Sequence, residues 1–388
     1  ERGRSERANE QANRRGTTLP FNPMLTSLKT AHGDLSLPAF LPDATRGVVR
    51  CVDVDDVRQA GIDALMVNTL HLSSQPGVSV VKAAGGIHRF AGWDGPIASD
   101  SGGFQVLSLA AGGPKGVTVS AKGLSYKPEG RSKRRQLTPE KCIQYQVQLG
   151  ADILFCLDHC PPANADEAAH RESVAHTVAW ARQCKDALGK RYSISDGFDR
   201  RPPTADCTRP LLFAVVQGGS HPSLRTECAE RLLEIGFDGF GFGGWPIAED
   251  GGLLEAVGQL AELLPDDLPL HGLGIGKPEN VLAAWRLGYH TFDCTLPTRD
   301  ARQGRLYQST SETFTGDYVY LHVEKERFSR DHSPIDEGCD CATCGRYSRA
   351  YLHHLFEIGE PAGARLATIH NLRFYGRLMK KLRGEPGG

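Results

Sequence analysis

Short apolar runs recur along the chain, and segments with helical periodicity separate them. Gly, Pro or Asp bounds each run, as is typical of strands in a core. The alternation of such runs with helical segments indicates a parallel α/β sheet. Eight runs are predicted to be strands: residues 35–42, 63–68, 95–99, 152–157, 211–217, 239–244, 269–275 and 289–294. Eight strand–helix units predict a TIM (β/α)8 barrel, with a doubly wound open sheet as the alternative.

Two segments between these runs are the best helix candidates. Residues 138–150 begin with Thr138, a preferred N-cap residue, and Pro139 follows at the first helical position. Residues 223–236 show the helical period. Both segments are therefore expected to cover the sheet.

The length of the chain leaves room for more than a barrel. A TIM barrel needs about 250 residues, whereas the chain has 388. Residues 1–18 are polar and charged, so we expect a mobile N-terminal tail there and no signal peptide. Residues 19–302 are assigned to the barrel, and residues 303–388 to a zinc-binding subdomain with a C-terminal helix.

Composition and charge indicate a soluble protein. Hydrophobic residues make up 40% of the chain, and no apolar stretch approaches the roughly 18 residues of a membrane span. The net charge is −1, so contacts with nucleic acid have to come from local clusters such as residues 131–135 or Arg299 with Arg302. The 11 cysteines are an odd number in a chain without an export signal, which favours reduced thiols and a cytoplasmic location.

Polar residues and glycines stand where the predicted strands end, and in a TIM barrel these ends carry the chemistry. Three of the ends carry a carboxylate, namely Asp100, Asp158 and Asp293, and a fourth carries Gln217. The other ends are rich in glycine, which lets a flat ligand approach the backbone. Taken singly, such residues are ordinary helix caps and turns. Together they predict one polar mouth.

A separate cysteine cluster predicts a structural metal site. Cys339, Cys341 and Cys344 have the spacing C-x-C-x-x-C, and His370 follows in a segment with helical periodicity. Three thiolates and an imidazole complete the tetrahedral set of a structural Zn²⁺ ion and leave no open position. His353 and His354 are alternatives for the fourth ligand, and reduced cysteines without a metal remain possible.

Several motifs resemble, in order and spacing, those of the tRNA-guanine transglycosylases. The similarity runs from about residue 15 to residue 384. The motifs are DSGGFQV (100–106), VVQGG (215–219), IGFDGFGFGG (235–244), FDCTLPTRDAR (292–302), CDCATC (339–344), SRAYLHHL (348–355) and TIHNL (368–372). The resemblance implies a TIM barrel with an inserted zinc subdomain. It also implies exchange of guanine at the wobble position of certain tRNA anticodons for a 7-deazaguanine such as preQ1 or queuine.

The resemblance implies a role for two of the carboxylates. Asp293 matches the family's nucleophile, which attacks C1′ of the ribose and gives a covalent ribosyl-enzyme. Asp100 matches the general acid/base, which protonates the departing guanine and takes a proton from the incoming base. Two displacements retain the β configuration, as in retaining glycosidases.

The resemblance also implies binding residues and partners. The residues predicted to bind the base are Ser101, Phe104, Asp158, Gln217, Gly243, Gly244, Trp245 and Leu273, of which Phe104, Asp158, Gln217 and Gly244 match family positions. Arg299 and Arg302 are expected to hold flanking phosphates or bases of the anticodon loop, and the local basic residues Lys380, Lys381 and Arg383 are expected to help clamp the backbone. The implied partners are tRNA, guanine and preQ1 or queuine, the implied cofactor is structural Zn²⁺, and the implied assembly is a homodimer or a dimer with a paralogue.

The chain departs from the family pattern around the base pocket. Trp245 and Pro246 stand where the family usually has Leu with small residues, and His159 replaces a carboxylate. Leu70 and Gln75 replace a Tyr and an Arg. The sequence therefore does not determine which 7-deazaguanine the pocket accepts.

Other functions remain open beside an active transglycosylase with an altered pocket. One is a non-catalytic, tRNA-binding subunit that supports an active paralogue. Another is a zinc-dependent barrel hydrolase, which would need an open metal site at the mouth. A DNA acceptor is also open, because arginines that bind phosphate do not read the ribose 2′-hydroxyl.

Overall fold

The computed structural model describes residues 25–109, 113–128, 133–192, 209–311 and 316–385. The predicted tail at residues 1–18 lies outside these ranges. None of the described helices has the length and apolar character that crossing a membrane requires.

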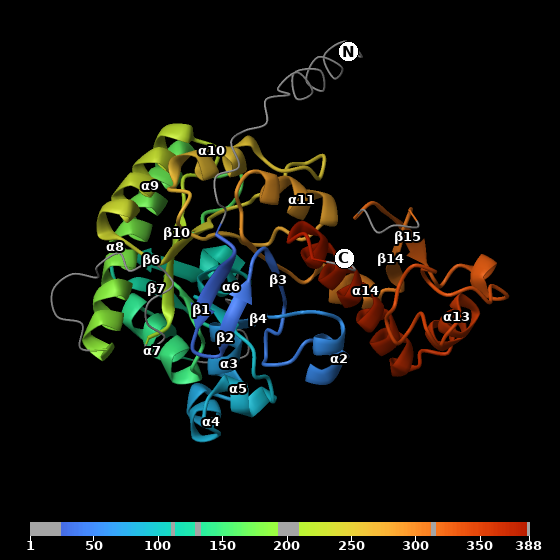
Figure 1. The fold of residues 1–388 in the computed structure, drawn as a ribbon. Helices are drawn as coiled ribbons and strands as arrows, with labels where there is room; N and C mark the ends of the chain where they lie inside the picture. The colour runs from blue at the N-terminus through green and yellow to red at the C-terminus, as the bar shows by residue number, and fades with distance from the viewer. Residues whose placement is uncertain (1–24, 110–112, 129–132, 193–208, 312–315, 386–388) are drawn as a thin grey trace, which may run out of the picture.

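Eight parallel strands form a barrel (Figure 1). The strands are β3 (Ala39–Pro42), β4 (Leu65–Asn68), β5 (Ile97–Asp100), β9 (Ile153–Phe155), β10 (Leu211–Val216), β11 (Gly239–Phe242), β12 (Leu270–Gly272) and β13 (Thr291–Cys294). Each strand pairs with the next along the chain, and β13 returns to β3. A parallel bridge between Asp43 and Met66 joins β3 to β4 and closes the ring. The predicted barrel is confirmed, and the open-sheet alternative is wrong.

The predicted strand at residues 35–42 is wrong in extent, because two elements share it. Gly33–Ser36 is β2, which pairs antiparallel with β1 (Ser27–Thr30), and β3 begins only at Ala39. The two elements meet at the cis peptide Leu37–Pro38, where proline has no N–H for a strand ladder. The hairpin packs Leu28, Leu35 and Leu37 against apolar side chains of the barrel strands and covers the amino end of the barrel.

The barrel interior is apolar below and polar at the carboxyl ends of the strands. Leu41, Met66, Ala98 and Val215 belong to one buried apolar cluster. Side chains alternate along a strand, so the residues two positions further on face the same way. These residues are Asp43, Asn68, Asp100 and Gln217. The uppermost layer of the interior is therefore polar on at least four strands.

Helices cover the outside of the barrel (Figure 1). They are α2 (Val54–Gln59), α3 (Thr69–Ser74), α4 (Val78–Ala83), α5 (Ile87–Ala91), α6 (Gly103–Leu109), α7 (Pro139–Leu149), α8 (Glu167–Tyr192), α9 (Pro222–Ile235), α10 (Glu255–Leu263), α11 (Pro278–Arg286) and α12 (Leu296–Arg302). The predicted start of α7 is confirmed, because Thr138 Oγ1 accepts the N–H of Lys141 at 3.2 Å. The helix predicted at residues 223–236 is α9, which begins one residue earlier at Pro222.

The segment between α6 and α7 forms a small sheet of its own. Its antiparallel strands are β6 (Val117–Ser120), β7 (Gly123–Tyr126) and β8 (Arg135–Leu137), preceded by the 3-10 turn η1 (Gly113–Gly116). Trp180 of α8 donates from Nε1 to the carbonyl of Ser120 at 3.2 Å and fastens the sheet to the barrel helices.

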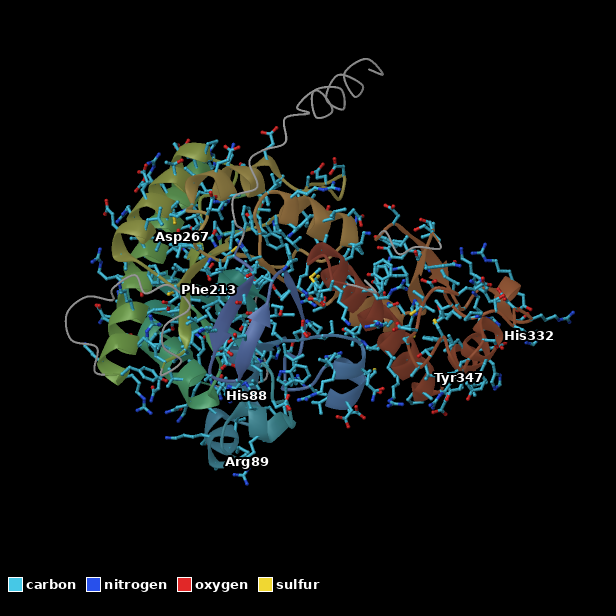
Figure 2. All side chains as sticks on the ribbon, viewed as in Figure 1. His88, Arg89, Phe213, Asp267, His332 and Tyr347 are labelled. Atoms are coloured by element: carbon cyan, nitrogen blue, oxygen red, sulfur yellow. The ribbon has the colours of Figure 1, made fainter. Side chains whose placement is uncertain are left out.

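The residues after α12 build a lobe beside the barrel. Its elements are β14 (Arg305–Ser309), β15 (Tyr318–His322), η2 (Glu326–Phe328), α13 (Arg349–Glu357) and α14 (Pro361–Leu382). Phe213 lies within the barrel, whereas His332 and Tyr347 lie in the lobe (Figure 2). Helix α14 returns to the barrel and packs against α12, β3 and α2. Arg365 makes a bidentate contact with Asp56 of α2, at 2.6 and 2.9 Å.

Candidate active site

A cavity of about 510 Å³ opens at the carboxyl ends of the barrel strands. The predicted residues that line it are Asp100, Ser101, Phe104, Asp158, Gly243, Gly244, Trp245, Leu273, Asp293 and Arg299. Gln217 is buried directly behind this lining and donates from Nε2 to Asp158 Oδ2 at 2.7 Å. The fold therefore brings the three predicted carboxylates and the amide together at one mouth, from β5, β9, β10 and β13.

Asp293 stands at the end of β13 with one oxygen held and one open. Oδ1 accepts the N–H of Gly274 at 3.1 Å and lies 3.0 Å from His271 Nε2. His271 Nδ1 in turn lies 2.8 Å from Thr291 Oγ1. Within the described part of the chain, no hydrogen bond reaches Oδ2 of Asp293. The contacts orient this carboxylate and leave a lone oxygen for a ligand.

His271 is a functional neighbour that sequence reasoning missed. It lies inside β12, is 1% exposed and belongs to an otherwise apolar run. A hydrogen bond to a carboxylate requires the proton on Nε2, so Nδ1 accepts from the Thr291 hydroxyl. A histidine within a predicted barrel strand could have pointed to this role. Whether its side chain points into the barrel could not be predicted without the strand register.

Asp100 at the end of β5 has the electrostatics of a proton donor. Its carboxyl accepts from Asn68 Nδ2 at 2.7 Å and from the N–H of Thr69 at 3.2 Å. Burial raises the pKa of Asp100 to about 8, and the negative charges of Asp293 and Asp43 act in the same direction. These effects outweigh the hydrogen bonds, which lower the pKa. At neutral pH the group is therefore mostly protonated.

Asp158 and Gln217 form a polar wall on the other side of the cavity. Burial raises the pKa of Asp158 to about 6, although the hydrogen bond from Gln217 opposes the shift. Gln217 is 1% exposed, and among the described residues its Oε1 has no hydrogen-bond partner. An unsatisfied buried acceptor is costly. A donor from a bound molecule would satisfy it.

Glycine is required next to this wall. A Cβ atom at Gly243 would lie 2.7 Å from Gln217 Nε2, closer than van der Waals contact allows. Gly244 has a φ of 102°, which side chains disfavour. The backbone of the β11 loop can therefore approach a flat ligand directly.

Two aromatic side chains flank the cavity. Phe104 and Trp245 meet edge to face with ring centroids 5.4 Å apart, and they are 43% and 45% exposed. Trp245 Nε1 donates to the carbonyl of Pro161 at 3.3 Å, which fixes the indole. Exposed aromatic faces of this kind suit a planar ring system.

Arginines gather beside the mouth. Arg299 is exposed and lines the cavity, whereas Arg302 is half-buried. Burial lowers the pKa of Arg302, as does the positive charge of Arg50. Within the described residues, Nη1 of Arg302 has no acceptor. Arg46 and Arg50, which the sequence reasoning did not single out, lie in the loop after β3 and add positive charge there.

The structure does not bring Lys380 and Lys381 to the mouth. They lie in the last turn of α14, where a Cβ atom at Gly61 would be 3.9 Å from Lys380 Cε. Gly61 precedes β4, so this turn lies at the amino end of the barrel. Arg383, just beyond it, donates to Asp63 at 2.9 Å.

Cys339, Cys341, Cys344 and His370 come together in the lobe, with all four potential ligand atoms within 4.8 Å of one another. His370 Nδ1 lies 3.3 Å from Cys344 Sγ and 3.8 Å from Cys341 Sγ. Its Nε2 lies 2.7 Å from the carbonyl of Tyr307. Donation from Nε2 to this carbonyl leaves the Nδ1 lone pair facing the sulfur atoms, as metal-binding histidines require. The cluster could hold a metal ion.

The other histidines considered for this cluster have different surroundings. His353 Nδ1 lies 2.9 Å from the carbonyl of Val323, and His354 is exposed on α13. The choice of His370 as the fourth member of the group is confirmed. The ten cysteines among the described residues form no disulfide, and Cys207 lies outside those residues.

The chain matches the family profile described as Queuine tRNA-ribosyltransferase over residues 23–385. A queuine tRNA-ribosyltransferase of Solidesulfovibrio magneticus is 38% identical over 357 residues, which cover 92% of this chain and 88% of that protein. Proteins of the same description from Pseudoalteromonas translucida and Thioalkalivibrio sulfidiphilus are each 38% identical. The first match covers 90% of this chain and 86% of the Pseudoalteromonas protein. The second covers 97% of this chain and 91% of the Thioalkalivibrio protein.

Proposed function

The chain belongs to the queuine tRNA-ribosyltransferase family of pentosyltransferases, and we propose that it exchanges guanine at the wobble position of tRNA for a 7-deazaguanine, preQ1 or queuine. One observation carries the proposal. An aspartate with an open oxygen faces the same cavity as Asp100, whose pKa is raised, and a polar wall in which Gln217 Oε1 has no hydrogen-bond partner among the described residues. These are the parts that exchange of a base at a sugar carbon needs.

In the first half of the exchange, Oδ2 of Asp293 attacks C1′ of the ribose. The C1′–O bond forms as the bond from C1′ to guanine breaks, and Asp100 gives its proton to the departing base. His271 and the N–H of Gly274 hold the other oxygen of Asp293 and fix its direction. The transition state resembles an oxocarbenium ion, which the negative charge of Asp293 stabilises.

In the second half, the new base replaces Asp293. Asp100, now ionised, takes a proton from the incoming base, whose nitrogen attacks C1′ and breaks the bond to the aspartate. Two inversions at C1′ retain the β configuration. Because Asp100 alternates between acid and base, a pKa of about 8 suits it better than the usual value of a carboxyl group.

The base lies, in this proposal, between the polar wall and the aromatic pair. Asp158 and Gln217 hydrogen-bond its edge, and the open Oε1 of Gln217 accepts one of its N–H groups. Ser101 and the backbone of Gly243 and Gly244 complete the edge contacts. Phe104 covers one face of the base. Leu273 and Trp245 bound the space left for a substituent at position 7.

We propose that tRNA is held by phosphate contacts beside the mouth. Arg299 and Arg302 follow the nucleophile on α12, and Arg46 and Arg50 add to the same positive surface. The extrusion of a wobble nucleotide into the cavity brings its phosphates within reach of these side chains. Lys380 and Lys381 lie near Gly61 at the amino end of the barrel, and their contact with tRNA stays a prediction, as do the dimer and the cytoplasmic location.

The metal in the lobe is proposed to be a structural Zn²⁺ held by Cys339, Cys341, Cys344 and His370. Such an ion, when bound, would tie α14 to the cysteine loop without a coordination site for chemistry. Purified protein should contain about one equivalent of zinc. Cys341→Ser should lose the zinc and lower the melting temperature by about 5 °C or more, since metal binding and folding are coupled.

The matched control for the zinc site is Cys51→Ser, a thiol that is exposed and lies outside the cluster. It should keep both the zinc and the melting temperature. Zinc bound equally by the two variants would contradict the assignment.

The proposed reaction is tested by incorporation of radiolabelled guanine into tRNA. Wild-type protein should incorporate label, and Asp293→Ala should reduce the rate by at least about 1,000-fold. The control is Asp267→Ala, an exposed aspartate between α10 and β12 (Figure 2). No incorporation by the purified wild-type protein would favour the non-catalytic subunit instead.

A zinc hydrolase is not supported. Among the described residues, the groups with the side chains to hold a metal ion are the lobe cluster and His32 with His88 and Asp152. Neither includes a residue that lines the cavity. The mouth therefore offers no open metal site in the described part of the chain.

A further inference from the structure

A fourth carboxylate, Asp43, stands at the mouth, and the exchange reaction as derived above does not use it. It directly follows β3, whose Leu41 and Pro42 pair with Asp293 and Cys294 of β13. On its other side, Asp43 pairs with Met66 of β4. Asp43 therefore lies between the strand that carries the nucleophile and the strand that leads to Asn68.

The register places the side chain of Asp43 on the inward face. It lies two residues beyond Leu41, which belongs to the apolar cluster of the barrel interior. Strands lie about 4.8 Å apart and rise about 3.3 Å per residue, so the Cα atoms of Asp43 and Asp293 are separated by roughly 8 Å. At that separation two inward-pointing carboxylates can contact neighbouring atoms of one bound sugar.

The electrostatics agree with this placement. Burial raises the pKa of Asp43 against the hydrogen bond from Thr45, and the negative charge of Asp293 raises it further. Asp43 in turn contributes to the raised pKa of Asp100. The negative charges of Asp43 and Asp293 therefore repel each other, and both oppose the ionisation of Asp100.

Asp43 has unused hydrogen-bonding capacity. Its one strong donor is the hydroxyl of Thr45, two residues on, and the backbone N–H of Thr45 adds a weaker contact. Among the described residues Asp43 forms no ion pair in direct contact, although the positive charge of Arg50 lowers its pKa. A carboxylate can accept about four hydrogen bonds, so acceptor positions remain open.

The position of Asp43 determines which part of a substrate it can meet. The base-edge residues Asp158 and Gln217 follow β9 and β10, across the ring from β3. Asp293 on β13 faces C1′ in the proposed reaction, so the side of the mouth formed by β3 and β4 faces the sugar. Next to C1′ the sugar offers the ring oxygen, which only accepts, and the 2′-hydroxyl, which donates. A carboxylate can accept a hydrogen bond from the 2′-hydroxyl but cannot form one with the ring oxygen.

We propose that Asp43 accepts a hydrogen bond from the 2′-hydroxyl of the nucleotide whose base is exchanged, and that this contact makes the enzyme select RNA over DNA. The inference rests on the proposed function and assigns it a specificity residue. With a deoxynucleotide, the acceptor positions of Asp43 that Thr45 does not fill lack this donor in a partly buried site beside the charge of Asp293. Sites with a buried polar group that loses its partner discriminate strongly against the substrate lacking it.

The test compares four proteins on two substrates. The substrates are an anticodon stem-loop RNA and the same oligonucleotide with one 2′-deoxyguanosine at the exchanged position. The proteins are wild type, Asp43→Ala and Asp43→Asn, with Asp267→Ala as control. The readout is kcat/KM for incorporation of radiolabelled guanine, and the melting temperature of each variant checks its fold.

Wild-type protein and the control should prefer the ribose substrate by about 10- to 100-fold. Asp43→Ala should lose most of this preference, because its rate falls on the ribose substrate and holds or rises on the deoxy substrate. Asp43→Asn should fall between, since an amide oxygen still accepts. With wild-type protein, a 2′-amino group, which restores a donor, should recover part of the rate.

Three results would overturn the inference. One is a wild-type enzyme that uses the two substrates equally, and another is an Asp43→Ala variant whose rate falls by the same factor on both. The third, which needs no variant protein, is a 2′-amino substrate that wild type uses no better than the deoxy substrate. Loss of guanine exchange on every substrate is a different outcome, because it contradicts the proposed function itself and the Asp43 contact with it.

Discussion

Each end of the barrel holds an aspartate in contact with histidine, and the two aspartates differ in what remains open. At the amino end, Asp152 lies 2.8 Å from His32 Nδ1 and 3.0 Å from His88 Nε2, and it accepts the N–H of Ile97 at 2.9 Å. Its side chain is 1% exposed, whereas Asp293 at the mouth is 20% exposed and, among the described residues, is hydrogen-bonded only at Oδ1. A saturated carboxylate stabilises the fold, while one with an open oxygen can react.

Asp152 at the amino end and Asp100 at the mouth have pKa shifts of opposite sign. Burial alone would raise the pKa of Asp152, but hydrogen bonds from His88, His32 and Ile97 together lower it. At Asp100 burial wins over two hydrogen bonds and raises the pKa to about 8. The balance between burial and hydrogen bonding separates the structural group from the proton donor: hydrogen bonds outweigh burial at Asp152, and burial outweighs them at Asp100.

The amino-end cluster also differs from a metal site. The rings of His32 and His88 stack with centroids 3.4 Å apart and planes 13° from parallel. A zinc ion lies about 2 Å from each ligating nitrogen, in the plane of its ring. Nearly parallel planes so far apart cannot meet at one ion, so the two imidazoles serve Asp152 as hydrogen-bond partners.

Replacing Asp100 is the strongest way to break the comparison at the mouth. Asp100→Asn should lower kcat by about 100- to 10,000-fold, because the amide cannot give up a proton to guanine. In wild type, activity should fall as pH rises above about 8, where Asp100 ionises. The measurement is a pH–rate profile of guanine exchange from pH 6 to 9.5 for both proteins. An unchanged wild-type rate through pH 9 would contradict the role of Asp100 as acid.

The Asp100→Asn variant, which should lose activity, should gain stability at high pH. Between the unfolded pKa of about 4 and the folded pKa of about 8, the folded state binds a proton that the unfolded state has released. The stability contributed by wild-type Asp100 therefore falls as pH rises through this window. Asp100→Asn should be more stable than wild type at pH 9, and urea unfolding at pH 5 and pH 9 measures the change.

Replacing Asp152 should lower the stability of the fold and leave the catalytic activity nearly unchanged. Asp152→Asn should lower the free energy of unfolding by about 2–4 kcal/mol at neutral pH, because two histidines and an amide lose a charged acceptor. The folded pKa of Asp152 is lowered, so its stabilisation is complete above the unfolded value near pH 4 and is lost as pH falls through the folded pKa. Urea unfolding tests this, and kcat should stay within about twofold. A large loss of kcat in folded protein would mean that the ends are coupled.

Replacing Trp245 should have the smallest effect. It tests whether this side chain limits which base the cavity accepts. Trp245→Leu removes the edge-to-face contact with Phe104 and the hydrogen bond to Pro161. We expect KM for the incoming base to change by about 3- to 10-fold, with a different factor for guanine, preQ1 and queuine. Equal changes for the three bases would show that Trp245 does not bound the substituent at position 7.

The sequence predicted the barrel and the convergence at its mouth because both follow from local patterns. Each strand was readable from its apolar run, and Asp100, Asp158 and Asp293 end such runs. In the lobe, the tight spacing of three cysteines predicted the cluster with His370 that the fold assembles.

What the sequence did not predict depends on register and on distant packing. The run at residues 35–42 ended the first strand one residue before Asp43, so the fourth carboxylate at the mouth was missed. His271 lies in an apolar strand, and only the pairing of β12 with β13 shows that it faces Asp293. Lys380 and Lys381 form a basic pair in sequence, but the path of α14 takes them to the opposite end of the barrel.

The open oxygen of Asp293 is tested most directly by trapping the intermediate. Wild-type protein is incubated with an anticodon stem-loop RNA, denatured and digested, and peptides carrying a ribosyl adduct are identified by mass spectrometry. The account predicts an adduct on the peptide that contains Asp293 and none in the Asp293→Ala variant. An adduct on Asp100 or Asp43 instead, or no adduct while guanine exchange proceeds, would contradict it.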